Sequence, residues 1–311
     1  MGDESHRRQE GAMPRLTFAF CGDIIWSRHV HAVATRRGID HLFLKIAPLV
    51  RRADCVLANL EGCISTRGTP MDNKAYTFRA PPELAPALRR AGISTVTLGN
   101  NHAMDYGAVA LQDTFVHLER AGVCWAGAGT DVQHATQPIW VEAKGVRVAI
   151  VCFTAIVPGG FAARRSAPGV ATFEHILPRL PEVRRQADVL IAVPHWGVEN
   201  EHAPSPKQKR MARLLHEAGV DLIVGHHSHV VQGYERIGQT HVLYSVGNLV
   251  HTPRSVATRR AGILWAEVHH DGVSNLRFIP LWLQYGQPMP APRAHAQALA
   301  RLVAPLPCAD H

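Results

Sequence analysis

Short apolar runs rich in β-branched residues alternate along this chain with segments whose apolar residues recur at helical spacing. The apolar runs predict strands at residues 16–23, 54–62, 93–97 and 188–197, a hairpin over 138–153, and two strands joined by a polar turn over 220–235. The helical spacing predicts helices at 39–53, 81–92, 107–122 and 206–219. Such alternation favours a layered α/β fold.

No internal repeat or linker interrupts the alternation, which predicts one domain over residues 14–285. Residues 1–13 and the Ala/Pro-rich segment 286–311 are predicted to be peripheral tails. The first dozen residues lack the apolar core of a secretory signal, and no stretch approaches the ~20 apolar residues that cross a bilayer. The six cysteines form no Cys-x-x-Cys pair. We therefore expect a cytoplasmic protein in a reducing compartment, with no membrane association.

Side chains of the kinds that bind metals occur where the apolar runs stop. In chain order they are Asp23, Asn59, Glu61, Asn101, His102, His195, His227 and His229. Ligands gather at the carboxyl ends of strands in open α/β sheets, so these separate segments predict a single site. Carboxylates, an amide and imidazoles without cysteine suit a hard-to-borderline divalent cation. The prediction is a site for one or two ions of Mn²⁺, Zn²⁺, Mg²⁺ or Ca²⁺.

His227 and His229 are two residues apart in a segment that we expect to be extended. Their side chains should then project to the same side, toward the metal, and that of His226 should point away. The chain has twenty histidines, so most of them are expected at the surface or in the core.

Residues beside the predicted ligands are candidates for supporting roles. His102 and Asp105 are the catalytic candidates. Asp105 would orient the imidazole of His102, or else cap the helix that follows. Trp196 and Glu199 follow His195 into a loop, where they would line a substrate pocket; a packed tryptophan and a solvated glutamate are equally compatible with the sequence.

The net charge of +8 comes largely from scattered arginine doublets, which are typical of solvated helix ends. No concentrated basic face or nucleic-acid-binding module is visible, so no nucleic-acid partner is expected. A positive field would instead attract an anionic small substrate or peptide.

Six motifs resemble, in order, those of CapA-type proteins, which are associated with poly-γ-glutamate capsule synthesis and belong to the calcineurin-like metallophosphatase superfamily. The motifs are CGDIIW, ANLEG, GNNHAMDYG, PHWGVE, GHHSHVVQ and YSVGN, between about residues 16 and 250. The resemblance implies a four-layered α/β/β/α sandwich.

The resemblance also implies roles for single residues. Asp23 resembles the first-motif aspartate, Glu61 takes the place of the metal-bridging aspartate, and Asn101 looks like the amide ligand with His102 as the acid beside it. His195 resembles the lone histidine ligand, and His227 with His229 the terminal His-x-His pair. Asn59, Gln232 and Asn248 would bind substrate, although turn chemistry also accounts for Asn248. One departure is Ile25, which stands where a phosphatase motif has histidine.

Three functions compete on this basis. The first is a metal-dependent enzyme that acts on a peptide or polyglutamate-type substrate by acid/base chemistry at a carbonyl, with His102 transferring the proton. Because some relatives resemble lasso-peptide epimerases, this chemistry includes Cα epimerisation as well as hydrolysis. The second is phosphoester hydrolysis, which usually uses two metals ~3.5–4 Å apart. The third is a non-catalytic partner in poly-γ-glutamate synthesis. We expect the first, because Ile25 leaves one metal position with fewer ligands than a full phosphatase site has.

Overall fold

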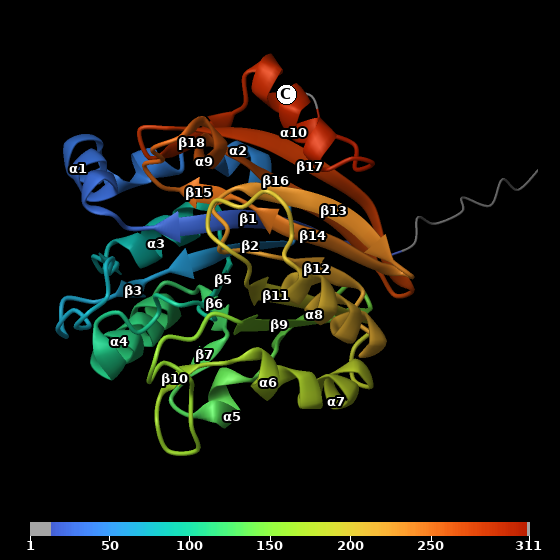
Figure 1. Cartoon of the computed structure of the whole chain (residues 1–311), viewed down its shortest axis with the longest axis horizontal. Helices are drawn as coiled ribbons and strands as arrows, with labels where there is room; N and C mark the ends of the chain where they lie inside the picture. The colour runs from blue at the N-terminus through green and yellow to red at the C-terminus, as the bar shows by residue number, and fades with distance from the viewer. Residues whose placement is uncertain (1–13, 310–311) are drawn as a thin grey trace, which may run out of the picture.

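Two β-sheets stack on each other in the computed structural model, which describes residues 14–309 (Figure 1). The first sheet has the order β18-β17-β16-β1-β2-β5-β6, and β15 also pairs with β1. Its strands are β1 (Leu16–Ile25), β2 (Cys55–Glu61), β5 (Thr95–Thr97), β6 (Cys124–Ala126), β15 (Asn248–Val250), β16 (Arg260–His269), β17 (Gly272–Gln284) and β18 (Gln287–Pro290).

The second sheet has the order β13-β14-β12-β11-β9-β8. Its strands are β8 (Ile139–Ala143), β9 (Val146–Thr154), β11 (Val189–His195), β12 (Leu222–Val224), β13 (Val231–Ile237) and β14 (Thr240–Val246). Two short pairs lie outside the sheets: β3 (Cys63–Ile64) with β4 (Arg79–Ala80), and β7 (Ala128–Gly129) with β10 (Gly169–Val170).

The helices cover the outer faces of the two sheets. Those packed on the first sheet include α1 (Arg28–Arg37), α2 (Ala47–Val50), α3 (Leu84–Ala91) and α4 (Gly107–Arg120). Those packed on the second are α5 (Val132–Ala135), α6 (Phe173–Ile176), α7 (Leu180–Arg184) and α8 (Pro206–Glu217). The remaining helices are α9 (Val256–Arg259) and α10 (Arg293–Leu302). None of the helices within residues 14–309 is both long and apolar enough to cross a membrane.

Alternation of side chains along the strands produces the layers. On β1, Phe18 and Phe20 enter the core between the sheets, whereas Ala19 and Cys21 enter the core between the first sheet and its helices. A third core fills the space between the second sheet and its helices. Successive residues of a strand point to opposite faces, so strands buried on both faces read as continuous apolar runs. The predicted α/β/β/α sandwich is confirmed.

Two predicted elements differ from the structure. The helix predicted at 39–53 is broken into a 3₁₀ turn, Ile39–Leu42, and the short helix α2. Pro48 lies in the first turn of α2, where its missing N–H costs nothing, and so it starts a new helix instead of continuing the first.

The segment 286–311 is not a peripheral tail over its described part, so that prediction was wrong. β18 pairs with β17, and α10 packs against the sheet, at the top of Figure 1. Leu299 and Val303, one helical turn apart, are fully buried in the core between the sheets. The predicted tail at 1–13 lies outside the described residues.

Candidate metal centre

The first sheet supplies two carboxylates from neighbouring parallel strands. Asp23 on β1 is in register with Asn59 on β2, and Glu61 ends β2. The side-chain nitrogen of Asn59 donates to Asp23 Oδ1 (2.9 Å) and to Glu61 Oε2 (3.4 Å). All three side chains are buried. Asn59 therefore fixes the spacing of the two acids.

Gly22 lets Asp23 reach this position. A Cβ at residue 22 would lie 2.1 Å from the carbonyl oxygen of Gly247, which is far inside contact distance. Without a side chain there, β1 approaches the segment before β15 closely enough for the Asp23 N–H to donate to Gly247 O (3.1 Å).

The second sheet supplies the imidazoles. His195 ends β11, and His227 and His229 follow β12 in a tight turn. His195 Nε2 lies 3.0 Å from His227 Nδ1 and 2.8 Å from the side-chain oxygen of Asn101, which follows β5 of the first sheet. The predicted amide and imidazole ligands thus meet across the two sheets.

The segment of His227 and His229 is not extended, contrary to our expectation. Both residues have positive φ (94° and 57°), an uncommon conformation for non-glycine residues that is found often at functional sites. The turn still brings both imidazoles to the site, with ring centroids 5.9 Å apart. His226 was predicted to point away, and this was wrong: its Nδ1 lies 2.8 Å from Asp23 Oδ1.

One oxygen at the centre of the cluster has no protein partner. Glu61 Oε1 is buried and makes no hydrogen bond to any residue of 14–309. Yet three imidazole Nε2 atoms surround it, those of His195 (3.7 Å), His102 (3.8 Å) and His229 (3.8 Å). A buried carboxylate oxygen without a partner is costly, and a cation among these atoms would satisfy it.

Among residues 14–309, three overlapping sets of side chains could hold an ion, each with ligand atoms within 4.8 Å of one another. They are Glu61 with His195 and His227; Asp23 with Glu61 and His229; and Glu199 with His227 and His229. Oxygen and imidazole nitrogen donors of this kind fit Mn²⁺, Zn²⁺ and related divalent ions.

Electrostatics favours the metal-binding form at Asp23, His195 and His227, whereas the carboxylates of Glu61 and Asp23 raise the pKa of His229 to about 9 against the effect of burial. Burial, reinforced by the nearby His229, lowers the pKa of His227 to about 4, and burial lowers the pKa of His195 well below its usual range. Both rings are therefore neutral near pH 7. Burial would raise the pKa of Asp23, but hydrogen bonds with His226 and His229 lower it well below its usual range. Burial raises the pKa of Glu61, and a neighbouring cation would lower it again by stabilising the carboxylate.

His102 is held by Asp105 beside the cluster. Its Nδ1 lies 2.7 Å from Asp105 Oδ2, which also accepts the Phe78 N–H (2.7 Å). A carboxylate only accepts, so His102 Nδ1 carries the proton and Nε2 is left bare. Burial lowers the pKa of His102 although Asp105 opposes the shift, so the ring is neutral near pH 7. The predicted orienting contact is present.

Lys74 completes this arrangement and was missed by the sequence analysis. Its ammonium contacts Asp105 Oδ1 and the carbonyl oxygen of Asn101, and lies 3.1 Å from His102 Nδ1. It comes from the loop between β3 and β4, which carries no apolar run and no ligand-type pattern. No local signal in the sequence marks it.

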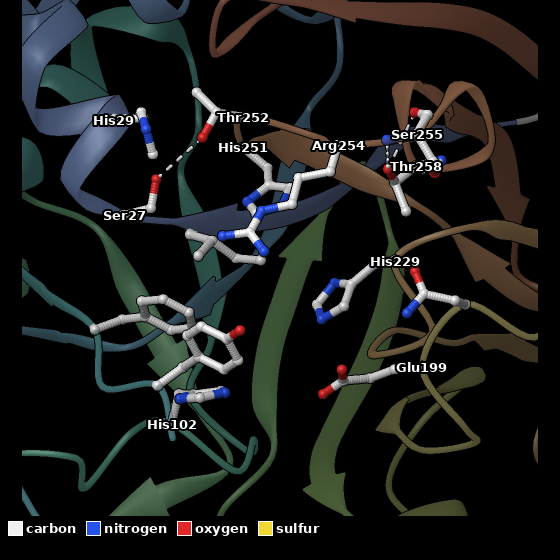
Figure 2. Close-up of a pocket in the computed structure, with 14 residues that line it drawn as sticks. Ser27, His29, His102, Glu199, His229, His251, Thr252, Arg254, Ser255 and Thr258 are labelled. Carbon is white, nitrogen blue, oxygen red and sulfur yellow. Dashed lines mark hydrogen bonds between the residues drawn. The ribbon is translucent and has the colours of Figure 1, made fainter. Parts of the chain in front are cut away.

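A cavity of about 350 Å³ lies over the cluster (Figure 2). His102 lies on one side of it, and His229 and Glu199 lie on the other. Ile25 also lines it, so an apolar side chain occupies the wall where a phosphatase motif would place histidine. Of the predicted substrate-binding residues, Glu199 lines this cavity.

The other four predicted substrate-binding residues are internal. Trp196 is fully buried, and its indole N–H donates to Tyr244 O (2.9 Å). Gln232 is fully buried and donates to Glu201 O (2.8 Å). Asn248 Oδ1 lies 3.1 Å from His229 Nδ1, and Asn59 bonds the two acids. The structure thus places these four side chains inside the protein, with hydrogen bonds to its own groups, and none of them lines the cavity over the cluster.

Comparison with known proteins agrees with this geometry. Residues 17–253 match the model of a family described as bacterial capsule synthesis protein PGA_cap. The chain is 30% identical over 298 residues to the capsule biosynthesis protein CapA of Bacillus anthracis, covering 93% of this chain and 72% of the relative. It is also 30% identical over 279 residues to the PGA biosynthesis protein CapA of Bacillus subtilis, covering 88% and 73%. A probable polyglutamine synthesis accessory protein of Mycobacterium tuberculosis is 32% identical over 210 residues, covering 63% and 55%.

Solved structures share the fold at low sequence identity. A phosphatase from Mycoplasma pneumoniae superposes with a TM-score of 0.54 at 15% identity, covering 87% of this chain and 95% of that one. A putative 5′-nucleotidase from Staphylococcus aureus superposes with a TM-score of 0.52 at 16% sequence identity. The match covers 93% of this chain and 58% of that one. The architecture is thus that of the calcineurin-like metallophosphatases.

Proposed function

This chain belongs to the bacterial capsule synthesis family PGA_cap, and from this premise we propose that it is a divalent-metal-dependent enzyme acting at a carbonyl of an acidic, peptide-like substrate. The observation that carries the proposal is Glu61 Oε1, a buried oxygen without a partner inside a ring of three imidazoles.

The proposed ligands come from both sheets. They are Asp23, Glu61, Asn101, His195, His227 and His229. Short contacts between Asn101, His195 and His227 support this assignment of ligands. The neutral state of His195 and His227 supports it too, because a metal ion binds imidazole only in its neutral form. The bound ion would act as a Lewis acid on the substrate carbonyl, which makes a neighbouring proton easier to remove.

His102 is the proposed proton-transfer residue. Its bare Nε2 lies 3.8 Å from Glu61 Oε1 and the residue lines the cavity, and Asp105 would stabilise the imidazolium that forms when Nε2 takes up a proton. In hydrolysis this proton comes from water; in epimerisation it comes from Cα and is replaced from the opposite face.

Epimerisation needs a second proton-transfer group across the substrate. Asp105 is unsuited, because it is fully buried and bonded to Lys74, His102 and the Phe78 N–H. Glu199 lies across the cavity from His102 and is the better placed group (Figure 2).

Phosphoester hydrolysis is the second candidate, because solved structures with this fold include a phosphatase and a putative nucleotidase. At 15% and 16% identity that likeness concerns the fold alone. Ile25 weighs against this candidate, because it places an apolar group where a further metal ligand would be needed.

The test is incubation with γ-linked glutamate oligomers and with ribosomal lasso-type peptides in deuterium oxide, with Mn²⁺ or Zn²⁺ added, read by mass spectrometry. One deuterium gained without cleavage indicates epimerisation, and one water divided between two fragments indicates hydrolysis. His102→Gln should abolish either reaction and keep the bound metal, whereas His227→Ala should lower metal content. Turnover of generic phosphoesters with peptides untouched would contradict the proposal, as would a protein that recruits no metal.

A further inference from the structure

We propose that the cavity over the metal centre and a second, arginine-lined cavity beside it form one groove that binds an acidic chain of several residues. The inference deepens the proposed function and rests on it for the identity of the reacting end. It adds that the substrate is recognised well beyond the residue that reacts.

The second cavity measures about 290 Å³ and adjoins the first, because His29 and Thr252 line both. Its wall includes Arg36 from α1 and Arg259 from α9, together with Tyr285, and contains no carboxylate. None of the residues that make up the candidate metal centre lines it. This cavity is therefore suited to binding and not to the chemical step.

A third arginine lies in the wall of the first cavity, over the metal centre. Arg254 lines the first cavity, and Figure 2 shows its guanidinium extending toward the space between His102 and His229. Arg36 comes from α1, whereas Arg254 lies just before α9 and Arg259 ends it. Among the ion pairs formed by residues 14–309 none involves these three arginines, whereas Arg67, Arg90 and Arg184 each pair with an aspartate.

A guanidinium presents a planar fork of donors that matches a carboxylate. Three guanidinium groups along two adjoining cavities suit a chain that carries a carboxylate at each residue better than they suit a single small anion. Tyr285 (72% exposed) at the second cavity and Tyr76 (61% exposed) at the first offer aromatic surface at low entropic cost for the stem of such a chain. Binding energy from residues far from the reacting centre can then hold the substrate in position.

The experiment measures binding, by isothermal titration calorimetry, of γ-linked glutamate oligomers from the monomer to the hexamer. Metal is removed by a chelator, so the result is independent of any reaction. We expect affinity to rise with length, and the double variant Arg36→Gln/Arg259→Gln to weaken hexamer binding by about tenfold or more. Monomer binding should change little.

The matched control is Arg179→Gln/Arg185→Gln, which also removes two positive charges, from exposed positions at the two ends of α7 in the opposite helical layer. It should bind the hexamer as the wild type does, and glutamine peptides of equal length should bind weakly to all variants. Thermal unfolding of the Arg36→Gln/Arg259→Gln variant shows whether its fold is intact.

Equal affinity for the monomer and the hexamer would contradict the proposed groove. Equal losses of hexamer affinity in the Arg36→Gln/Arg259→Gln variant and in the control would also contradict it. Tighter binding of an oligonucleotide through the same arginines would also overturn it. Length-dependent binding without any metal-dependent turnover would leave the groove standing and contradict the proposed function; turnover without length dependence would do the reverse.

Discussion

Lys74 illustrates how one residue can organise the chemistry without touching the candidate metal ligands through their side chains. It contacts Asp105, the ring of His102 and the backbone carbonyl of Asn101. Its charge lowers the pKa of His102, in the same direction as burial, the larger cause, and against the effect of Asp105. Lys74 thereby helps to keep His102 neutral and able to accept a proton.

Replacing Lys74 by methionine should raise the pKa of His102, because the positive charge is lost and Asp105 then acts on the ring without compensation. A base with a higher pKa is protonated over a wider range, so the acidic limb of the kcat/KM profile should move to higher pH. Activity at neutral pH should fall by about 10–100-fold, the usual cost of losing an orienting partner. A pH series of kcat/KM measures both effects.

Lys74→Arg is the control, since it keeps the charge and should restore most of the wild-type profile. Bound metal, measured by elemental analysis, should be unchanged in both variants. A profile that does not move in Lys74→Met would contradict a role in setting the pKa of His102.

At the scale of elements, close approach between backbones places the ligands. β1 carries Asp23 because Gly22 allows the segment around Gly247 to lie directly against it. The turn after β12 carries His227 and His229 in left-handed backbone conformations, and Asn248 on β15 contacts His229 through its side-chain oxygen. These contacts couple the ends of β1, β12 and β15.

Gly22→Ala should disturb this arrangement. The added Cβ would meet the Gly247 carbonyl oxygen at 2.1 Å, and because the obstacle is backbone, a strand must move. Overpacking of this kind typically costs ~1–3 kcal/mol of unfolding free energy. We expect a loss in this range in urea denaturation, with weaker metal binding because Asp23 shifts.

Gly145→Ala is a useful comparison, since a Cβ there meets no atom within 4 Å and only the strain of its positive φ (73°) remains. It should cost less than Gly22→Ala and leave metal binding intact. Equal metal binding in Gly22→Ala and wild type would show that the close approach is not what places Asp23.

On the scale of the whole molecule, each sheet holds an incomplete half of the candidate centre. The first sheet brings Asp23, Glu61 and Asn101, and the second brings His195, His227 and His229. The core between the sheets aligns the two halves. An ion bound there would link the sheets.

Removing the metal should therefore destabilise the entire protein and not the site alone. An ion at about 100 times its dissociation constant adds ~2.7 kcal/mol to the stability of the native state. Scanning calorimetry with and without chelator should show a fall in Tm of a few degrees. His227→Ala should lower the Tm and remove most of its dependence on metal. A wild-type Tm that does not respond to chelator would contradict an ion bound between the sheets.

Local patterns along the chain specify the layered fold and the strand ends that carry the candidate site. Apolar runs and helical spacing are local signals, and parallel strands of one sheet end at a common edge, so the sequence pattern places Asp23 and Glu61 together. The meeting of these acids with His195 depends on how the second sheet stacks on the first. The break of the 39–53 helix was also encoded locally, by Pro48.

Which polar side chains face the cavity depends instead on contacts made in three dimensions. Trp196 and Gln232 lie beside predicted site residues in the chain but form hydrogen bonds inside the core, and His226 bonds to Asp23 instead of turning away. Lys74 and Arg254 reach the site from loops without any periodic pattern. Spacing along a strand determines the side of a side chain; in turns and loops, the direction depends on contacts with segments far away in the chain.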